Sequence, residues 1–441
     1  MQLVIETLKE GNGCGYLEDK EIHVPKALPQ ETIEIQEIRR KKHKRLASIL
    51  RIKNKSKDRV RPKCKHFHQC AGCQFQHLKY AKQLTEKQEL IQAYFPQSEV
   101  ASIVPSRPFF YRNKLELSFF QDDKKHNLGF FPLFGRKVFD LKTCLLFDPW
   151  IKKAKKLVKR WWKKTGYLPY HLRKNRGTLR NITFRTAKHT KDKMVILQLN
   201  SDASFAPKRK DLDVLKKALC KIEPNMSFFI QLWTVKPKQP TRTFLWHYSG
   251  KEHLEEELHL KHKTLRFFIS PTTFFQPNIQ MAEQMFSTIY EWLIPYKGGV
   301  CLDLYCGIGT ISLSICDLFQ KVYGVELNKE AILDANVAKT LNHIQNVEFL
   351  AQDAKMFLRE KREEKIDVVI IDPPRCGLDP KSRQMILEIQ PKAIIYLACN
   401  PKTQKEDIEM LSSHYKIEKI QPFDQFPNTH HVENLVLMTL C

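Results

Sequence analysis

Two short segments near the end of the 441-residue chain carry the residue types that could do chemistry. The first is Asp372–Gly377 (DPPRCG) and the second is Ala398–Pro401 (ACNP). Each directly follows a short apolar run, and such runs predict buried strands of a parallel sheet. Ligands of open α/β sheets gather at the carboxyl ends of the strands. The pattern therefore predicts a carboxylate, Asp372, and a thiol, Cys399, at the edge of one crevice.

A cysteine that follows a strand is most often only a small core residue, so the thiol needs further support. From residue 266 onward, apolar strands alternate with helices, which is typical of an α/β sheet. Gly307 and Gly309 follow the expected strand 300–304 and precede a helix expected at about 311–319. Glycines at such a turn let a ligand approach the backbone closely, although two of them are fewer than the full dinucleotide fingerprint.

Acidic residues end the next strands of this unit. Strand 321–325 ends at Glu326, where a carboxylate can accept hydrogen bonds from both hydroxyls of a ribose. Strand 347–350 leads to Asp353, which is placed to meet the edge of an adenine. A last pair, at about 415–420 and 435–438, is expected as a hairpin-like edge and completes seven strands. The order of functional residues at the ends of these seven strands favours an S-adenosylmethionine methyltransferase over a dehydrogenase.

Glu433 lies just before the last expected strand, near the same crevice. Taken alone, it is more often a charge on a loop.

The charge balance indicates a polyanionic partner. Seventy-four basic residues stand against 48 acidic ones, a net charge of +26, which favours nucleic acid. We find no apolar run of about 18 residues and no amphipathic basic helix, so a membrane is disfavoured. The start of the chain shows no secretion signal. Twelve unequally spaced cysteines then favour reduced thiols and metal ligands in a cytoplasmic protein.

Short alternating strands with Gly and Pro turns predict a small β-barrel over residues 1–58. Residues 36–65 hold fourteen Lys and Arg against two acids. Such a run is as often a solvated face. Together with the overall charge, it favours phosphate contact by release of counterions. We expect an OB-like barrel that grips RNA.

Cys64, Cys70 and Cys73 follow the spacing C-x5-C-x2-C, which predicts one metal centre with a fourth ligand from elsewhere. Cys144 is the candidate for that ligand. Four thiolates suit either a [4Fe–4S] cluster or structural zinc. Three nearby histidines leave a mixed Cys/His zinc site open: His66, His68 and His77.

Aromatic and basic residues interleave at 159–164, and basic residues cluster again at 171–176. Base stacking and phosphate contact could use both segments. A helix that buries its Trp residues and exposes its Lys residues explains the first segment equally well.

Taken together, these motifs resemble those of the RNA uracil-C5 methyltransferase family, the enzymes that make 5-methyluridine, in its iron–sulfur ribosomal RNA branch. The matching segments are Phe274–Asn278 (FFQPN), Asp303–Gly309 (DLYCGIG), Asp372–Gly377, Cys399–Pro401 and His431–Glu433 (HVE). In front of them, Arg59–Cys64 and Cys70–His77 resemble that branch's cluster segment. Residues 1–58 resemble its RNA-binding TRAM domain more weakly.

The resemblance implies an α/β fold in which residues 266–441 form a class I Rossmann-like S-adenosylmethionine methyltransferase domain with a seven-stranded sheet. A TRAM-like OB-fold barrel (1–58) and an α+β central domain (59–265) precede it, and the central domain carries the four-cysteine site and RNA contacts. The implied function is methylation of C5 of a specific uridine in 23S ribosomal RNA by a monomer. A transfer-RNA uridine enzyme and a non-catalytic RNA-binding assembly protein are the alternatives. Cytosine enzymes are disfavoured, because they carry a Cys where Arg375 stands.

The resemblance also assigns residues by position. Cys399 matches the nucleophile, Glu433 the base, and Asp372 a catalytic carboxylate. The cofactor-binding positions are Gln276, Tyr305, Thr310, Glu326, Asp353 and Asp372. The ligands of the [4Fe–4S] cluster are Cys64, Cys70, Cys73 and Cys144. Two departures are Ala71, where Gly is common, and Cys376, an extra thiol.

The implied mechanism begins with addition of the Cys399 thiolate to C6 of uracil, which makes C5 nucleophilic toward the methyl group of the sulfonium. Glu433 then removes the C5 proton. We expect the polar crevice and the cationic cofactor to favour the thiolate.

Overall fold

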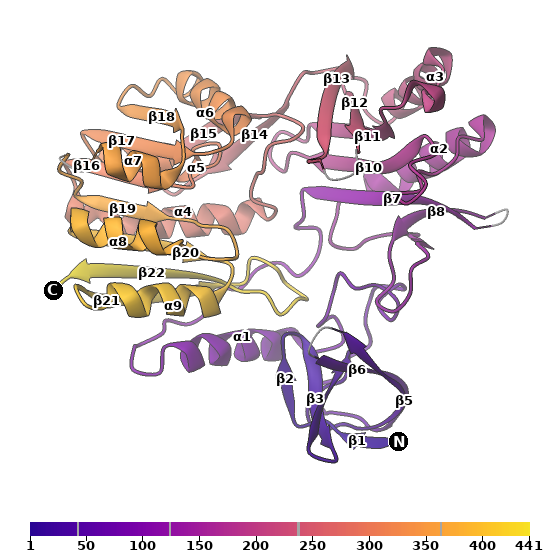
Figure 1. Ribbon diagram of the computed structural model, residues 1–441, viewed down its shortest axis with the longest axis horizontal. Helices are drawn as coiled ribbons and strands as arrows, with labels where there is room; N and C mark the ends of the chain where they lie inside the picture. Colours follow the sequence, from indigo (N-terminus) through magenta and orange to yellow (C-terminus); the bar gives the residue numbers. More distant parts are fainter. Residues whose placement is uncertain (42–43, 123–124, 236–238, 362–363) are drawn as a thin grey trace.

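The computed structural model describes residues 1–441 apart from 42–43, 123–124, 236–238 and 362–363. Residues 42–43 of the predicted basic run therefore lie outside the described residues. Figure 1 shows a strand-rich N-terminal body, a central sheet with helices on its outer side, and a C-terminal α/β unit. Over the described ranges, we find no helix that is long and apolar enough to cross a membrane.

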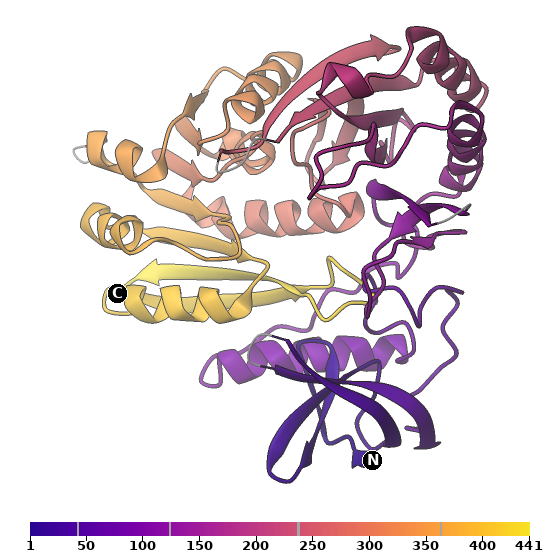
Figure 2. The same ribbon diagram turned by 45° about the vertical axis from the view of Figure 1, so that its right-hand side comes forward.

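The first body is a six-stranded sheet with the order β1-β5-β6-β4-β3-β2. Its strands are β1 (Gln2–Val4), β2 (Thr7–Lys9), β3 (Asn12–Leu17), β4 (Lys20–Pro25), β5 (Thr32–Lys41) and β6 (Lys44–Asn54). The sheet curls on itself around a small apolar core (Figure 2). Gly15 permits the closure, because a Cβ there would lie 2.0 Å from the carbonyl oxygen of Val4. The predicted barrel is confirmed.

The central sheet has seven strands in the order β13-β12-β11-β10-β7-β8-β9. They are β7 (Lys114–Asp122), β8 (Lys125–Phe130), β9 (Phe139–Asp140), β10 (Leu179–Thr186), β11 (Lys193–Asn200), β12 (Ser227–Thr234) and β13 (Arg242–Ser249). The helical segments here are α2 (Trp150–Thr165), η1 (Ala203–Phe205) and α3 (Arg209–Cys220). Trp161 and Trp162 of α2 are 4% and 0% exposed in the core under this sheet. Their use for base stacking is therefore excluded, and the alternative of a helix that buries Trp is confirmed. Helix α2 is an amphipathic basic helix, so the expectation that the chain has none is wrong.

The C-terminal sheet has the order β18-β17-β16-β19-β20-β22-β21. Its strands are β16 (Val300–Leu304), β17 (Lys321–Glu326), β18 (Val347–Ala351), β19 (Val368–Ile371), β20 (Ala393–Ala398), β21 (Tyr415–Phe423) and β22 (Glu433–Leu440). The first five are parallel, and β22 is antiparallel to both β20 and β21. The predicted α/β class and the seven-stranded sheet are confirmed.

Helices cover both faces of this sheet (Figure 1). They are α4 (Ile279–Leu293), η2 (Ile294–Tyr296), α5 (Thr310–Ile315), η3 (Cys316–Leu318), α6 (Lys329–Leu341), α7 (Ala354–Glu360), α8 (Pro380–Ile389) and α9 (Pro401–Leu411). The hairpin of β14 (Leu254–His259) and β15 (Thr264–Ile269) shares a core with α4 and β16. The expected division after residue 265 runs through this hairpin, and the domain division stays a prediction.

Helix α1 (Tyr80–Tyr94) lies beside α9 of the C-terminal unit in both views (Figures 1 and 2). Lys87 of α1 forms an ion pair with Asp424, and their side chains are 1% and 0% exposed. The Tyr80 hydroxyl donates to the same carboxylate over 2.7 Å. Further along, the backbone N–H of Asn428 donates to Gln83 of α1 over 3.0 Å. The segment between β21 and β22 is thereby fixed to α1.

We predict that Lys87→Met lowers the free energy of unfolding by about 3–5 kcal/mol, because it leaves the Asp424 carboxylate buried without its cation. Lys82→Met on the same helix is the matched control, since Lys82 pairs with Glu86 at the surface and should cost about 0–1 kcal/mol. Urea unfolding measures both. Equal losses in the two variants would contradict this role for the buried pair.

Candidate active site

The register of the antiparallel pair β20–β22 brings the thiol and the base together. Ala398 pairs with Asn434, so Cys399 and Glu433 are the next two residues across this ladder. On the other side, Ile371 of β19 pairs with Tyr396 of β20, which puts Asp372 at the same sheet edge. All three predicted catalytic side chains line one cavity.

This cavity has a volume of about 770 Å³ and lies at the carboxyl ends of the parallel strands. Of the other predicted cofactor positions, four line it: Gln276, Tyr305, Glu326 and Asp353. Thr310 does not belong to the described lining; it is the first residue of α5, and its carbonyl accepts a hydrogen bond from Ser314.

The turn after β16 has a left-handed backbone at Tyr305, Gly307 and Gly309, with φ of 64°, 56° and 75°. A Cβ at Gly309 would lie 2.3 Å from the ring of Phe349, whereas one at Gly307 would meet nothing within 4 Å. Gly307 also lines the cavity, and its N–H donates to Glu326 over 3.3 Å. The turn therefore leaves room for a ligand while it is bonded to the end of β17.

A loop over residues 270–276 brings Gln276 to the cavity. Arg185 of the central sheet donates three hydrogen bonds to this loop, to the carbonyls of Ser270, Pro271 and Thr273. Asp334 of α6 accepts from the Ser270 and Thr273 hydroxyls over 2.6 and 2.8 Å. The central sheet thus helps to build the cavity wall.

Arg375 connects the two chemistry-bearing loops. Its carbonyl accepts a hydrogen bond from Asn400 over 3.0 Å, and its guanidinium acts to lower the pKa of the Cys399 thiol. From the sequence, Arg375 was expected only to distinguish uracil from cytosine enzymes, and its effect on the thiol was not predicted. Its position three residues after Asp372, at the same strand end, was the available signal.

Burial has the largest effect on the pKa values of the three catalytic groups, and neighbouring carboxyls come second. Burial, then the Glu433 and Asp372 carboxyls, raise the pKa of the Cys399 thiol to about 11, against the lowering effect of Arg375. Burial also raises the pKa of Glu433 well above its usual value and that of Asp372 to about 7. The expectation that the crevice by itself favours the thiolate is wrong, because burial disfavours the charged form of the thiol and two carboxyls add to this effect.

A second hollow of about 450 Å³ reaches the thiol from the other side. It shares Arg375 and Cys399 with the first cavity. Its remaining walls come from the barrel, Phe75, α1, residues 400–402 and residues 430–432. The barrel contributes Glu10 and Gly11 at the turn between β2 and β3. Cys399 is therefore accessible from both the cofactor-sized cavity and the side of the barrel.

The four predicted cluster cysteines line a separate cavity of about 480 Å³: Cys64, Cys70, Cys73 and Cys144. Nowhere in the described ranges do three of these sulfurs lie within 4.8 Å of one another. A single zinc ion with Zn–S bonds of about 2.3 Å needs them closer than that. The ring nitrogens of His66 are occupied by Lys142 N–H and by Gln69, which disfavours His66 as a ligand.

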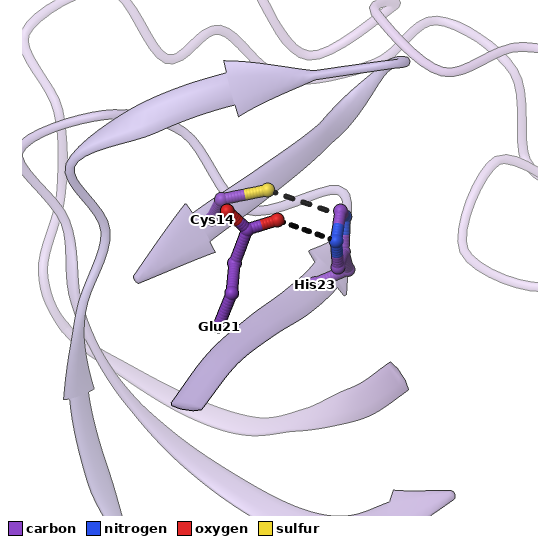
Figure 3. Close-up of side chains that lie close together, drawn as sticks. All are labelled: Cys14, Glu21 and His23. Atoms are coloured by element: carbon purple, nitrogen blue, oxygen red, sulfur yellow. Dashed lines mark hydrogen bonds and ion pairs between the residues drawn. The ribbon is translucent and has the colours of Figure 1, made fainter. Parts of the chain in front are cut away.

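Two other groups of ligand-type side chains do approach within 4.8 Å among the described residues. Figure 3 shows the first, in the barrel, where the Cys14 sulfur lies 3.3 Å from Nδ1 of His23, and Nε2 of His23 lies 2.7 Å from Glu21. Both ring nitrogens are thus used within the group, which ties β3 to β4. The second group is His189, His259 and Glu283.

The comparisons identify the family. The family model described as tRNA (uracil-5-)-methyltransferase matches residues 79–440. The chain belongs to this family. It is an RNA uracil-C5 methyltransferase, which confirms the resemblance at that level; the ribosomal RNA branch stays a prediction.

The sequence similarity to relatives extends along almost the whole chain. The chain is 34% identical to an uncharacterized RNA methyltransferase of Protochlamydia amoebophila, over 95% of this chain and 100% of that one. It is 31% identical to an uncharacterized RNA methyltransferase of Staphylococcus aureus, over 99% and 97%. The crystal structure of Pyrococcus abyssi tRNA (uracil-54, C5)-methyltransferase in complex with S-adenosyl-L-homocysteine matches with a TM-score of 0.79 and 27% identity, over 100% of this chain and 99% of that one.

We predict that Asp372→Asn becomes increasingly stabilising relative to the unmodified chain as the pH rises from about 4 to 8. The folded chain keeps Asp372 protonated up to a pKa of about 7, whereas the unfolded chain loses the proton near 4. The folded state therefore binds the extra proton in this window, and stability falls as the pH rises through it. The gain from Asn should be roughly 1–3 kcal/mol at pH 8, measured by thermal unfolding at several pH values.

Asp379→Asn is the control with the opposite sign. Hydrogen bonds from Ser382 and the start of α8 outweigh burial and lower the pKa of Asp379. Its replacement should therefore cost stability above pH 4 and little below it. The same pH trend in both variants would contradict the raised pKa of Asp372.

Proposed function

We propose that this enzyme uses S-adenosylmethionine to methylate C5 of a uridine in 23S ribosomal RNA. The observation that carries the chemistry is a single cavity lined by all three catalytic positions and by four further cofactor positions. A volume of about 770 Å³ is within the usual range for a cofactor site. The S-adenosyl-L-homocysteine bound in the Pyrococcus abyssi enzyme supports this choice of cofactor.

Four of the lining residues would hold the cofactor. Glu326 would accept hydrogen bonds from the ribose hydroxyls, and Asp353 would meet the adenine edge. Gln276 and Tyr305 would contact it from the lead-in loop and the glycine turn, where Gly307 leaves open space. When bound, S-adenosylmethionine supplies a methyl group from a positively charged sulfonium.

Cys399 is the proposed nucleophile. Its thiolate adds to C6 of uracil, so that a C–S bond forms and the electron pair of the C5–C6 double bond becomes an enolate that is nucleophilic at C5. With a thiol pKa of about 11, the group is protonated in the empty site. Positive charge at the site favours its ionisation, and Arg375 already supplies part of that charge. Asp372 hydrogen-bonds to the uracil ring and orients it.

Glu433 is the proposed base. After C5 carries the methyl group, Glu433 takes the remaining C5 proton, the electron pair restores the C5–C6 double bond, and the C6–S bond breaks to release the Cys399 thiolate. Burial raises the pKa of Glu433, so the same positive charge that ionises Cys399 is needed to ionise Glu433, and the carboxylate then formed is the stronger base. Its neighbour Asn434, hydrogen-bonded to Gln404 over 2.8 Å, fixes the start of β22.

The assignment of 23S ribosomal RNA as the substrate rests on the N-terminal part of the chain. The cysteine segment resembles the ribosomal RNA branch, and the barrel (1–58) would act as its TRAM-like RNA grip, with residues 59–265 as the central domain and 266–441 as the methyltransferase domain. A transfer RNA is the second candidate, supported by the description of the matching family model and by the Pyrococcus abyssi enzyme.

A [4Fe–4S] cluster is the group we propose for the four cysteines. Their spread around one cavity suits a group larger than a single metal ion, and the donor set is the usual one for such a cluster. The ligands come from residues 64–73 and from Cys144 after β9, so a cluster would hold these segments together beside the central sheet. The transfer chemistry needs no electron from it.

We predict that cells lacking this gene lose 5-methyluridine at one or more positions of 23S ribosomal RNA while transfer RNA keeps it. Mass spectrometry of nuclease fragments from both RNA classes measures this. The unmodified gene should restore the mark, and Cys399→Ala should not. Loss confined to transfer RNA would select the second candidate, and restoration by Cys399→Ala would contradict the proposed nucleophile.

We predict that the chain purified without oxygen is brown and contains about four iron and four acid-labile sulfide per chain. Cys73→Ser should lose most of the iron and lower the thermal stability, because the cavity wall loses its ligand. Cys220→Ser, at a cysteine outside the cavity, should keep full iron. One zinc per chain in place of iron would overturn the cluster.

A further inference from the structure

Helix α2 has one basic face and one apolar face. Its sixteen residues include eight Lys and Arg and no acid. The apolar residues, with the two Trp side chains, face the core of the central domain. Figures 1 and 2 show the helix at the outer edge of that domain, away from the C-terminal α/β unit.

Seven basic side chains line a hollow of about 450 Å³ on this helix, which we call the α2 groove. They are Lys142, Lys152, Lys155, Lys156, Lys159, Arg160 and Lys163. Six of them come from α2, and Lys142 comes from the segment that follows β9. The described lining includes neither an acidic nor an aromatic residue.

Only one carboxylate balances this charge. Asp140 lies 2.7 Å from Lys155 and 2.9 Å from Lys159. The other five cations have no acidic partner within the part of the chain that the structure describes. Like charges four residues apart, such as Lys152 and Lys156 or Lys159 and Lys163, each cost a helix roughly 0.2–0.5 kcal/mol. A bound polyanion would offset this repulsion.

The wall formed by Lys142 is held in place by the cysteine segment. The backbone N–H of Lys142 donates to His66 over 2.8 Å. The neighbouring residues Leu141, Thr143 and Cys144 line the cysteine cavity on the other side of the chain. The groove is therefore tied to a fixed part of the central domain.

We propose that the α2 groove binds the phosphodiester backbone of the RNA substrate at a segment away from the methylated uridine. Six ammonium groups and one guanidinium, with no aromatic side chain in the described lining, suit phosphates better than base edges. The position of α2 at the outer edge of the molecule makes the contact one with flanking RNA. This assignment rests on the proposed function for the identity of the polyanion.

Two double variants of the full-length enzyme, with its metal group retained, test the groove. Lys156→Gln/Lys163→Gln removes two exposed lysines that line it. Lys153→Gln/Lys164→Gln removes two exposed lysines of the same helix that do not. Binding to 23S ribosomal RNA and to transfer RNA transcripts is measured by filter retention over a range of KCl concentrations.

The groove variant should bind its RNA roughly tenfold more weakly, with a log K against log[salt] slope shallower by about 1.4–1.8, while the control keeps the slope of the unmodified enzyme. Its KM for RNA should rise with an unchanged kcat, because the contact is made equally in the ground and transition states. Thermal unfolding of the groove variant should be unchanged or higher, since repulsion is removed.

Equal slopes for the two double variants would overturn the proposal. Unchanged RNA binding together with weaker binding of polyglutamate would also overturn it, in favour of an acidic protein partner. These binding measurements test RNA binding by the α2 groove whether or not the enzyme methylates either transcript. Absence of methylation on both transcripts would contradict the proposed function and leave the result for the groove intact.

Discussion

The buried ion pair between Lys87 and Asp424 is the constraint on which the active site depends. The segment between β21 and β22 has no strand of its own to hold it, yet Glu433 must follow it at the edge of the cavity. The pair, with the Tyr80 hydroxyl and Gln83, fixes that segment to α1 from a distant part of the sequence. Removal of either charge would leave the other buried without a partner, and the segment would then lose this attachment to α1.

Charge is distributed unevenly over the molecule, and the distribution agrees with the chemistry. The chain carries a net +26, but five acidic and only two basic residues line the catalytic cavity. An acidic cavity stabilises a cationic ligand, and burial together with the same carboxyls raises the pKa of Cys399. The Cys399 thiol therefore stays protonated until a positive charge binds beside it. The excess of cations lies outside the cavity, on surfaces such as the α2 groove.

Much of the fold and the site followed from sequence pattern, because apolar runs stopped by Pro or Gly mark the strand ends that carry Asp372 and Cys399. The hairpin-like pair at the end of the chain was predicted, and β21 and β22 form it. The place of β22 next to β20, which brings Glu433 beside the thiol, could not be derived from periodicity. The contact of Arg375 with Cys399 and the pairing of Lys87 with Asp424 join residues far apart in sequence. Only packing fixes such contacts. The early stop of α5 at Ile315 was also missed, since no Pro or Gly marks it.

The central claim is that Cys399, held beside Glu433 and Asp372, attacks the uracil ring. The most direct measurement is to give the enzyme and S-adenosylmethionine an RNA in which 5-fluorouridine replaces uridine, so that no C5 proton can be removed. The account predicts a covalent complex that survives denaturation, with the nucleotide on the Cys399 peptide. An adduct on Cys376, or no adduct with an RNA whose unmodified form is methylated, would contradict it.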